Sequence, residues 1–171
     1  MAIRDRLPLH NTIAAFELAR MERFRDAFTL GAHGRRFGAI YLLGYFVEMT
    51  LKSAFFTLLG FRTEEPITAK DLATAANLAE EDLRVDTQKE QYHSFVFWAR
   101  AIVSLCDHFG DPIPSDTLQE LGWRSQRMTS NWKVSMRYSQ EIATEEEWTR
   151  FQDDANWLEG NYVDISERGR P

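Results

Sequence analysis

The side chains in this sequence that could transfer a proton or hold a phosphate are its histidines and arginines. None of the four histidines lies in a His-x-x-x-His or HExxH arrangement, so their spacing predicts no metal site. Arg100 and His108 fall on one expected helix together with His93. Helix geometry places Arg100 and His108 about 80° apart around the axis and about 12 Å apart along it. Side chains that far apart do not easily bind one phosphate, so we predict no catalytic site. Arg100, His108 and His93 are the runner-up candidates for a catalytic site.

Other sequence signals of chemistry are weak. A Ser/His/Asp triad is compatible with the order of the residues, but no Gly-x-Ser-x-Gly motif marks a nucleophile. The glycines within residues 31–38 precede a helix without a preceding strand, so they indicate a turn and not a phosphate-binding loop. Cys106, the single cysteine, excludes an internal disulfide and lies in an apolar helical stripe, as a core residue does. The sequence therefore predicts no cofactor.

Charge is spread unevenly along the chain. The net charge is −6, which is not typical of a general nucleic-acid binder. Arginines nevertheless gather in residues 1–36, where Arg20, Arg35 and Arg36 could form a local anion site. A solvated helix face explains these arginines as well, and we favour it. Arg20 also lies three residues after Glu17 on the same side of the expected helix, so these two can form an ion pair.

The element that must position the other helices is the apolar stretch 37–59. Aliphatic and aromatic residues lie on nearly every face of it, as in a helix that is buried on all sides or that spans a membrane. Glu48 and Lys52 fall near its middle, where each charge would be costly in a bilayer. We therefore predict a core helix, no membrane span, and Gly60 as the C-terminal stop of this helix.

Glu48 is expected to have a partner, because an unpaired buried carboxylate is costly. One candidate is Lys52, four residues later on the same face, in the favourable order for such a pair. The other candidate is Arg137, carried by residues 132–138. That segment alternates apolar and polar residues with period two, which predicts an extended conformation. The side chains expected to face the bundle are Trp132, Val134, Met136 and Tyr138.

Caps and apolar periodicity predict an all-α, single-domain bundle of five or six helices over residues 1–171. A helix capped by Asn11 or Thr12 is expected to run to about Leu30 and to pack antiparallel to the core helix after a glycine turn. The other expected helices are a short one after Thr68, one from about Gln88 to Phe109 closed by Gly110, one from Ser115 or Asp116 to about Thr129, and a last one opened by the capping box Thr144–Glu147. Residues 166–171 are expected to fray.

Two aromatic residues fall on the polar sides of their expected helices. Phe97 lies opposite the apolar stripe of its helix, and Trp157 lies on the polar side of the last helix. Exposed apolar patches are typical of contact surfaces, and a two-fold homodimer is the commonest oligomer. We therefore predict a homodimer that uses at least one of these residues. The lone cysteine and the lack of an apolar leader in residues 1–12 indicate a cytoplasmic protein.

Two segments resemble motifs of the HEPN superfamily of small helical bundles. Residues 41–52, YLLGYFVEMTLK, are similar to its core-helix signature of Tyr-Leu-x-Gly-Tyr-x-x-Glu-x-x-x-Lys. Trp132 with Met136-Arg137-Tyr138-Ser139 is similar to a Trp…Arg-Tyr-Ser segment before the last helix in one branch of that family. The resemblance implies a HEPN-like fold that dimerises or binds a partner, for example a nucleotidyltransferase. It also implies a prokaryotic stress, defence or toxin–antitoxin-like system with RNA or nucleotide links.

Catalytically active HEPN proteins are metal-independent ribonucleases that use an Arg and a His four to six residues apart near the start of a late helix. This sequence departs from that pattern, because no Arg-x(4–6)-His occurs in its C-terminal half. Arg4 and His10 have the spacing, but they lie at the N-terminal end. We therefore favour a non-catalytic module. One alternative is a divergent ribonuclease with a rearranged Arg/His site, in which a dimer brings Arg100 of one chain toward His108 or His93 of the other. A structural adaptor without a ligand is the third possibility.

Overall fold

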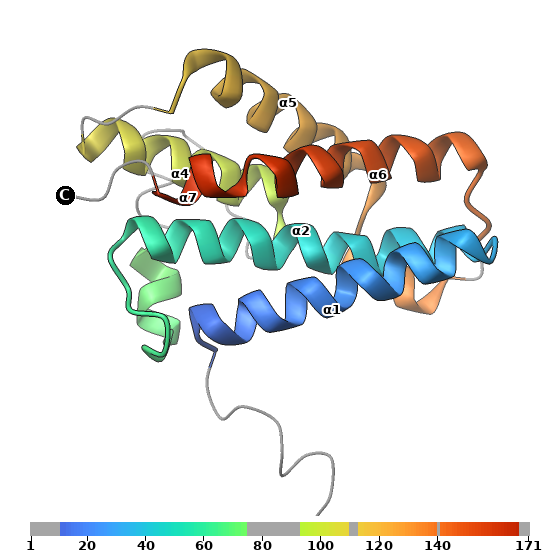
Figure 1. The fold of residues 1–171 in the computed structure, drawn as a ribbon, viewed down its shortest axis with the longest axis horizontal. Helices are drawn as coiled ribbons and strands as arrows, with labels where there is room; N and C mark the ends of the chain where they lie inside the picture. The colour runs from blue at the N-terminus through green and yellow to red at the C-terminus, as the bar shows by residue number, and fades with distance from the viewer. Residues whose placement is uncertain (1–10, 75–92, 110–112, 140, 168–171) are drawn as a thin grey trace, which may run out of the picture.

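The computed structural model describes residues 11–74, 93–109, 113–139 and 141–167, which form an all-α bundle (Figure 1). Its elements are α1 (Ile13–Ala32), α2 (Arg36–Leu58), α4 (Phe95–Phe109), α5 (Ser115–Asn131), the 3-10 helix η3 (Val134–Tyr138), α6 (Glu145–Gly160) and α7 (Tyr162–Glu167). Residues 69–74 are also helical. The β-type pairing found among the described residues is a single bridge between Asn11 and Ile67. The predicted fold class, an all-α bundle, is confirmed.

Helices α1 and α2 form an antiparallel hairpin, as expected from the glycines between them. Thr12 opens α1, since its hydroxyl accepts a hydrogen bond from the Ala15 amide at 3.0 Å. Gly34 takes the turn at a φ of +73°, and Gly60 follows α2 at a φ of +85°. Residues with a Cβ rarely adopt this left-handed conformation. Local sequence chemistry therefore sets both the hairpin turn and the end of the core helix.

Helix α2 is the centre of the bundle. It packs against α1, α4, α6 and α7, and it runs through the middle of the fold in Figure 1. Its large apolar side chains are fully buried together with those of α4: Leu43, Phe46, Leu51, Phe55, Phe56, Phe95 and Trp98. Among the helices of the described ranges, α2 alone is long and apolar enough to cross a membrane, but 72% of that apolar stretch is buried inside the bundle. A core helix has the same length and composition.

The first turn of α6 is anchored on the hairpin. It carries the predicted capping box, in which Thr144 Oγ1 accepts a hydrogen bond from the Glu147 amide and the Glu147 carboxylate accepts one from the Thr144 amide. Trp148 follows and lies on Gly31, where a Cβ atom would come within 2.4 Å of the indole. The same indole packs edge-on against Phe28, with ring centroids 5.9 Å apart. This contact fixes where α6 begins relative to α1.

The segment before α6 differs from its sequence prediction. Trp132 is extended, but Val134–Tyr138 form a 3-10 helix. Tyr138 is 76% exposed instead of facing the bundle, whereas Val134 and Met136 pack on the core. A 3-10 helix turns every three residues, so it cannot keep side chains of period two on one side. The prediction of an extended segment over residues 132–138 therefore holds for Trp132 and Lys133 and is wrong for Val134–Tyr138.

The C-terminal end is also more closely packed than expected. Ser166 was predicted to fray with the residues after it, but it belongs to α7 and is 3% exposed, because α7 packs on α2. Several sequence predictions lie outside the described residues: those on Arg4, His10 and Gly110, on the helical segments within 75–92, and on residues 168–171.

Candidate functional site

Four polar side chains share one face of the otherwise apolar helix α2. Tyr41, Tyr45, Glu48 and Lys52 are spaced four, three and four residues apart, which aligns them along the helix. We call this set the α2 polar row. Glu48 is buried, and the other three are half-buried. A cluster of titratable groups with perturbed pKa values is a candidate functional site when it also reaches solvent.

Glu48 holds the row together. Its Oε1 accepts a hydrogen bond from Lys52 Nζ at 2.5 Å, so the expected pair with Lys52 is formed. Its Oε2 lies 3.0 Å from Nδ1 of His93, which precedes α4. Burial raises the pKa of the Glu48 carboxyl, but the His93 hydrogen bond and the Lys52 charge outweigh burial and hold that pKa below its ordinary value. The carboxylate therefore stays charged inside the bundle.

His93 is the part of this cluster that reaches solvent. A carboxylate only accepts hydrogen bonds, so the contact with Glu48 requires a proton on His93 Nδ1. In the neutral ring, Nε2 is then the acceptor nitrogen, and 47% of the side-chain surface is exposed. Lys52 is held deeper, with its Nζ 5.6 Å from the centre of the Trp98 ring. A histidine oriented by a buried carboxylate is the arrangement of a general base.

The two tyrosines extend the row toward the N-terminus of α2. The hydroxyls of Tyr41 and Tyr45 lie 3.0 Å apart. Burial, the hydrogen bond with Tyr41 and the charge of Glu48 raise the pKa of Tyr45 to about 12. On the other side of α2, the Tyr162 hydroxyl donates to Glu17, and burial together with this hydrogen bond raises the pKa of Tyr162 to about 12.

Alkaline pH is expected to destabilise the protein as these tyrosines ionise. Tyrosine in an unfolded chain ionises near pH 10, whereas Tyr45 and Tyr162 have pKa values of about 12 in the folded protein. The stability that this difference provides is complete below pH 10 and is lost as the pH rises through 12. Tyr45→Phe and Tyr162→Phe should each lose less unfolding free energy than the wild type between pH 9 and 12 in urea titrations. Tyr138→Phe, at an exposed position, is the control, and equal losses in all four proteins would contradict the prediction.

Trp132 joins the row to η3. Its Nε1 donates a hydrogen bond to the Tyr41 carbonyl at 3.0 Å, although 91 residues separate the two. Its indole lies on Gly44, where a Cβ atom would be 2.0 Å from Nε1. The ring also packs edge-on against Tyr45 at 5.4 Å and stacks on Phe95 at 5.0 Å. The two segments that resemble HEPN motifs therefore contact each other at this point.

The alternative partner of Glu48, Arg137, does not reach it within the described part of the chain. The Arg137 guanidinium lies 4.7 Å from the centre of the Tyr138 ring, on the exposed side of η3. Lys52 and His93 already bind the two oxygens of Glu48. The 3-10 turn carries Arg137 outward, so of the two predicted partners Glu48 pairs with Lys52 and not with Arg137.

One of the runner-up catalytic residues, His93, contacts the α2 polar row. Arg100 and His108 are exposed on α4, and the His108 ring contacts Phe109 with centroids 5.5 Å apart. Among the contacts between described residues, His93 alone of the three binds a member of the row. His93 is therefore the runner-up residue that the structure joins to the row.

The arginines expected to form an anion site are separated and mostly paired. Arg20 is buried, where it donates to Glu17 at 2.8 Å and forms a second ion pair with Glu159. Arg36 pairs with an acid in the first turn of α6. Arg35 is exposed beside it, at the start of α2. The expected pair of Arg20 with Glu17 is formed, but the three arginines do not share one site, because Arg20 is used inside the bundle.

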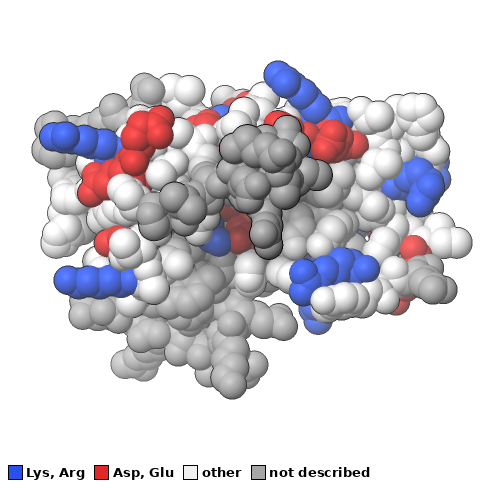
Figure 2. All heavy atoms as spheres, turned by 90° about the horizontal axis from the view of Figure 1, so that it is seen from below, with Lys and Arg blue, Asp and Glu red and all other residues white. Residues whose placement is uncertain are grey.

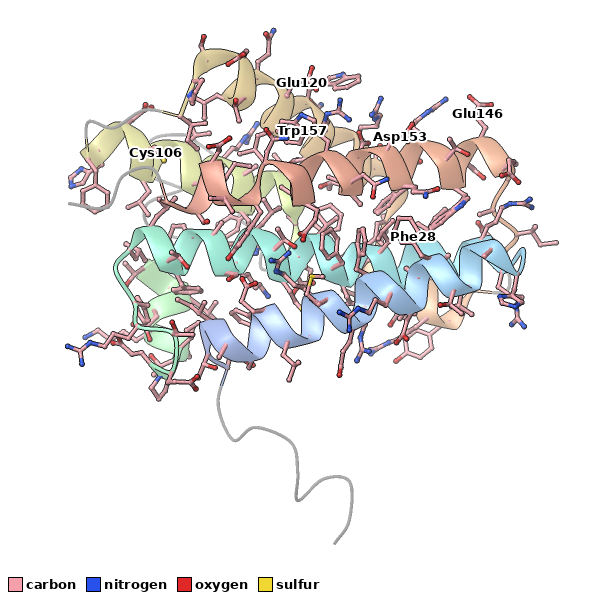
Figure 3. All side chains as sticks on the ribbon, in the orientation of Figure 1. Phe28, Cys106, Glu120, Glu146, Asp153 and Trp157 are labelled. Atoms are coloured by element: carbon pink, nitrogen blue, oxygen red, sulfur yellow. The ribbon has the colours of Figure 1, made fainter. Side chains whose placement is uncertain are left out.

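The two expected interface residues differ in their burial. Phe97 is only 3% exposed, because α4 packs against α2 on one side and α5 on the other. Its predicted position on a polar surface is therefore wrong. Trp157 is half-buried on α6, and its ring lies 5.2 Å from the Arg124 guanidinium (Figure 3). Trp157 stays a predicted interface residue.

Sequence reasoning missed a second buried ion cluster, between α5 and α6. The buried Asp154 carboxylate accepts hydrogen bonds from Arg124 at 2.8 Å and from Arg127 at 2.7 Å. A signal was present, since Asp154 lies in the apolar stripe of α6, three residues after Phe151 and four before Leu158. A buried carboxylate requires cations or hydrogen-bond donors, so this position predicts partners on a facing helix.

An open hollow lies beside Trp132, where α2, η3 and α6 begin or meet. Its volume is about 370 Å³, within the range of small-ligand sites. Apolar and hydroxyl-bearing side chains line it, among them Phe37, Ile40, Met136, Ser130, Ser135 and Ser139. Ile142, at 91% exposure, is also part of its lining. Lys133, Glu141 and Glu147 line it as well, so the hollow offers a mixed surface of apolar, hydroxyl and charged groups.

Charged residues on the face in Figure 2 do not form one basic surface. Lys and Arg side chains lie there in separate places with acidic side chains among them. Proteins that bind the nucleic-acid backbone gather basic side chains in one patch or stripe. The described residues on this face lack that footprint.

Comparison of the chain with family models, with curated proteins and with solved structures finds no match. The class of protein that the structure defines is an all-α helical bundle built around a buried central helix. The resemblance to HEPN proteins is thus carried by the motif residues alone.

Proposed function

We propose that this protein is a HEPN-like helical module of the cytoplasm that acts by dimerisation or partner binding and not by catalysis. The observation that carries the proposal is that the residues of the two HEPN-like motifs have structural roles in the bundle. Gly44 provides the space for Trp132, and Glu48 is neutralised by Lys52. The contact of Trp132 with Gly44 positions η3 against α2, and the pair of Glu48 with Lys52 offsets a buried charge within α2. Both motif segments thus serve the fold, and we assign recognition to the surface of the bundle.

The hollow beside Trp132 is the surface that we assign to a partner. Its mixed polar and apolar lining, with the exposed Ile142, fits a protein–protein contact, because such contacts combine apolar and polar groups. The net charge of −6 favours a protein partner over non-specific binding to nucleic acid. The resemblance suggests a nucleotidyltransferase as this partner, in a prokaryotic stress, defence or toxin–antitoxin-like system with RNA or nucleotide links.

The second candidate function is metal-independent cleavage of RNA, and the contact between His93 and Glu48 favours it. His93 Nε2 would take the proton of a ribose 2′-hydroxyl while the 2′-oxygen attacks phosphorus and the bond to the 5′-oxygen breaks. Water would protonate the leaving 5′-oxygen, so the products would be a 2′,3′-cyclic phosphate and a 5′-hydroxyl. Glu48 orients the imidazole for this role through Nδ1 at 3.0 Å.

Incubation of the purified protein with single-stranded and structured RNA in EDTA separates the two candidates. We expect no cleavage, because Glu48 and Lys52 neutralise each other and do not offer a free cation to a phosphate. His93→Gln tests whether any turnover depends on the histidine that contacts Glu48, and His33→Gln, exposed at the C-terminal end of α1, is the matched control. Cleavage that His93→Gln abolishes and His33→Gln preserves would overturn the non-catalytic proposal.

Light scattering at micromolar concentration tests dimerisation itself. We expect twice the chain mass of 19.9 kDa. A monomer mass would contradict dimerisation and would leave binding of another protein as the remaining form of the proposal.

A further inference from the structure

Helix α5 presents a stripe of charged and aromatic side chains to solvent. Glu120, Trp123 and Arg127 recur at three- and four-residue spacing, so they lie on one face of α5. Trp123 is 51% exposed, and the side chains of Glu120 and Arg127 are partly exposed. We call these three residues the α5 face. Figure 3 shows Glu120 on the side of the bundle that α5 and α6 form, away from α1.

The α5 face is held in place before any partner arrives. The Arg127 guanidinium lies 4.0 Å from the centre of the Trp123 ring, and Arg127 also binds the buried Asp154. Arg124 continues the arrangement, since its guanidinium lies between the rings of Trp123 and Trp157, at 5.7 and 5.2 Å. Side chains that are already ordered lose little entropy on binding, and Trp and Arg are the residue types that dominate interface energetics.

The order of charges along the α5 face makes it complementary to itself. Glu120 precedes Trp123 by about 4.5 Å along the axis, and Arg127 follows it by about 6 Å, at 1.5 Å per residue. If two copies of α5 pack antiparallel about a two-fold axis at Trp123, Glu120 of each copy lies opposite Arg127 of the other. The two tryptophans then meet at the centre. A two-fold interface requires this kind of self-complementary patch.

The local charge argues against nucleic acid as the occupant of this face. Arg124 and Arg127 both bind Asp154, and Glu120 pairs with Arg124 at 2.6 Å, so two carboxylates offset the two guanidinium charges. Acidic residues of α6, including Glu146 and Asp153, lie on the same side of the bundle (Figure 3). A face without net positive charge attracts a phosphate backbone little, whereas its alternating charges suit a partner that supplies both signs of charge.

We propose that the α5 face is the surface through which two copies of this chain associate, antiparallel and centred on Trp123. The inference rests on the proposed dimerisation and names its surface. Trp157 borders the face through Arg124, so the interface residue expected from the sequence lies at its edge.

Dissociation constants from sedimentation of the full chain test the proposal. Trp123→Asp should raise the dimer dissociation constant about thirtyfold or more, as loss of a central hot-spot residue does. Glu120→Arg should raise it about tenfold, because the new arginine faces Arg127 of the partner subunit. The control is Leu18→Asp, an exposed apolar position on α1 that should leave the constant unchanged. Unaltered helix content in circular dichroism shows that each variant folds.

The outcomes separate this inference from the function on which it rests. A wild-type dimer whose dissociation constant changes less than twofold in both Trp123→Asp and Glu120→Arg would overturn the α5 face and keep dimerisation. A wild-type monomer would remove both. If Trp123→Asp loses helix content, Glu120→Arg decides alone, because its side chain is partly exposed and Asp154 keeps both of its arginines.

Discussion

Gly44→Ala is expected to destabilise the protein by about 3–5 kcal/mol, the cost of losing a tryptophan from a core. A Cβ atom on residue 44 would lie 2.0 Å from Trp132 Nε1, and the helix backbone beneath it cannot retreat. The indole must then leave its site. It would lose the hydrogen bond to the Tyr41 carbonyl and the stacking on Phe95. Urea unfolding of the variant measures the change.

A double-mutant cycle makes this prediction specific. In a Trp132→Ala background the clash disappears, so Gly44→Ala should stabilise by roughly 1 kcal/mol through its better helix propensity. Gly122→Ala is the matched control, because Gly122 lies within α5 and a Cβ atom there meets nothing within 4 Å. It should stabilise the wild type by a similar amount. Equal effects of Gly44→Ala and Gly122→Ala in the wild type would show that the close approach of Trp132 is not needed.

Glu48→Ala is expected to cost about 3 kcal/mol at pH 7, as the breaking of a buried ion pair does. The change leaves the Lys52 ammonium half-buried without its carboxylate and removes the acceptor of the His93 hydrogen bond. Glu141→Ala, at an exposed position before α6, is the control and should change stability by less than about 0.5 kcal/mol. If Glu48→Ala lowered the free energy of unfolding as little as the control does, the result would contradict a buried ion pair.

The same pair predicts a dependence on acid. Because the folded pKa of Glu48 is lowered, its contribution is present above the unfolded value, about 4.3, and is lost as the pH falls through the folded pKa. The difference in unfolding free energy between wild type and Glu48→Gln should therefore narrow as the pH falls below about 4. A difference that stays constant from pH 6 to pH 3 would show that Glu48 is not held ionised by its partners.

The sequence by itself determined the features that depend on neighbours within a turn or two. The apolar run of α2 predicted a buried core helix, and the four-residue spacing of Glu48 and Lys52 made Lys52 one of the two candidate partners of Glu48. Thr12, Gly60 and the Thr144 capping box set helix ends through bonds or backbone conformations of one to four residues. These interactions need no knowledge of the fold, because helix geometry alone brings their partners together.

Only the tertiary structure decided which distant residues meet. Trp132 lies on Gly44 and reaches the Tyr41 carbonyl across 91 residues, and His93 reaches Glu48 across 45. Phe97 is buried because α2 and α5 both cover α4. The amphipathic pattern of α4 does not show that a second helix covers it. The periodicity of apolar residues in a sequence predicts which face of a helix is apolar. The partner on each face is chosen by how all the helices pack, and that choice joined the two motif segments and aligned His93 with the carboxylate of the central helix.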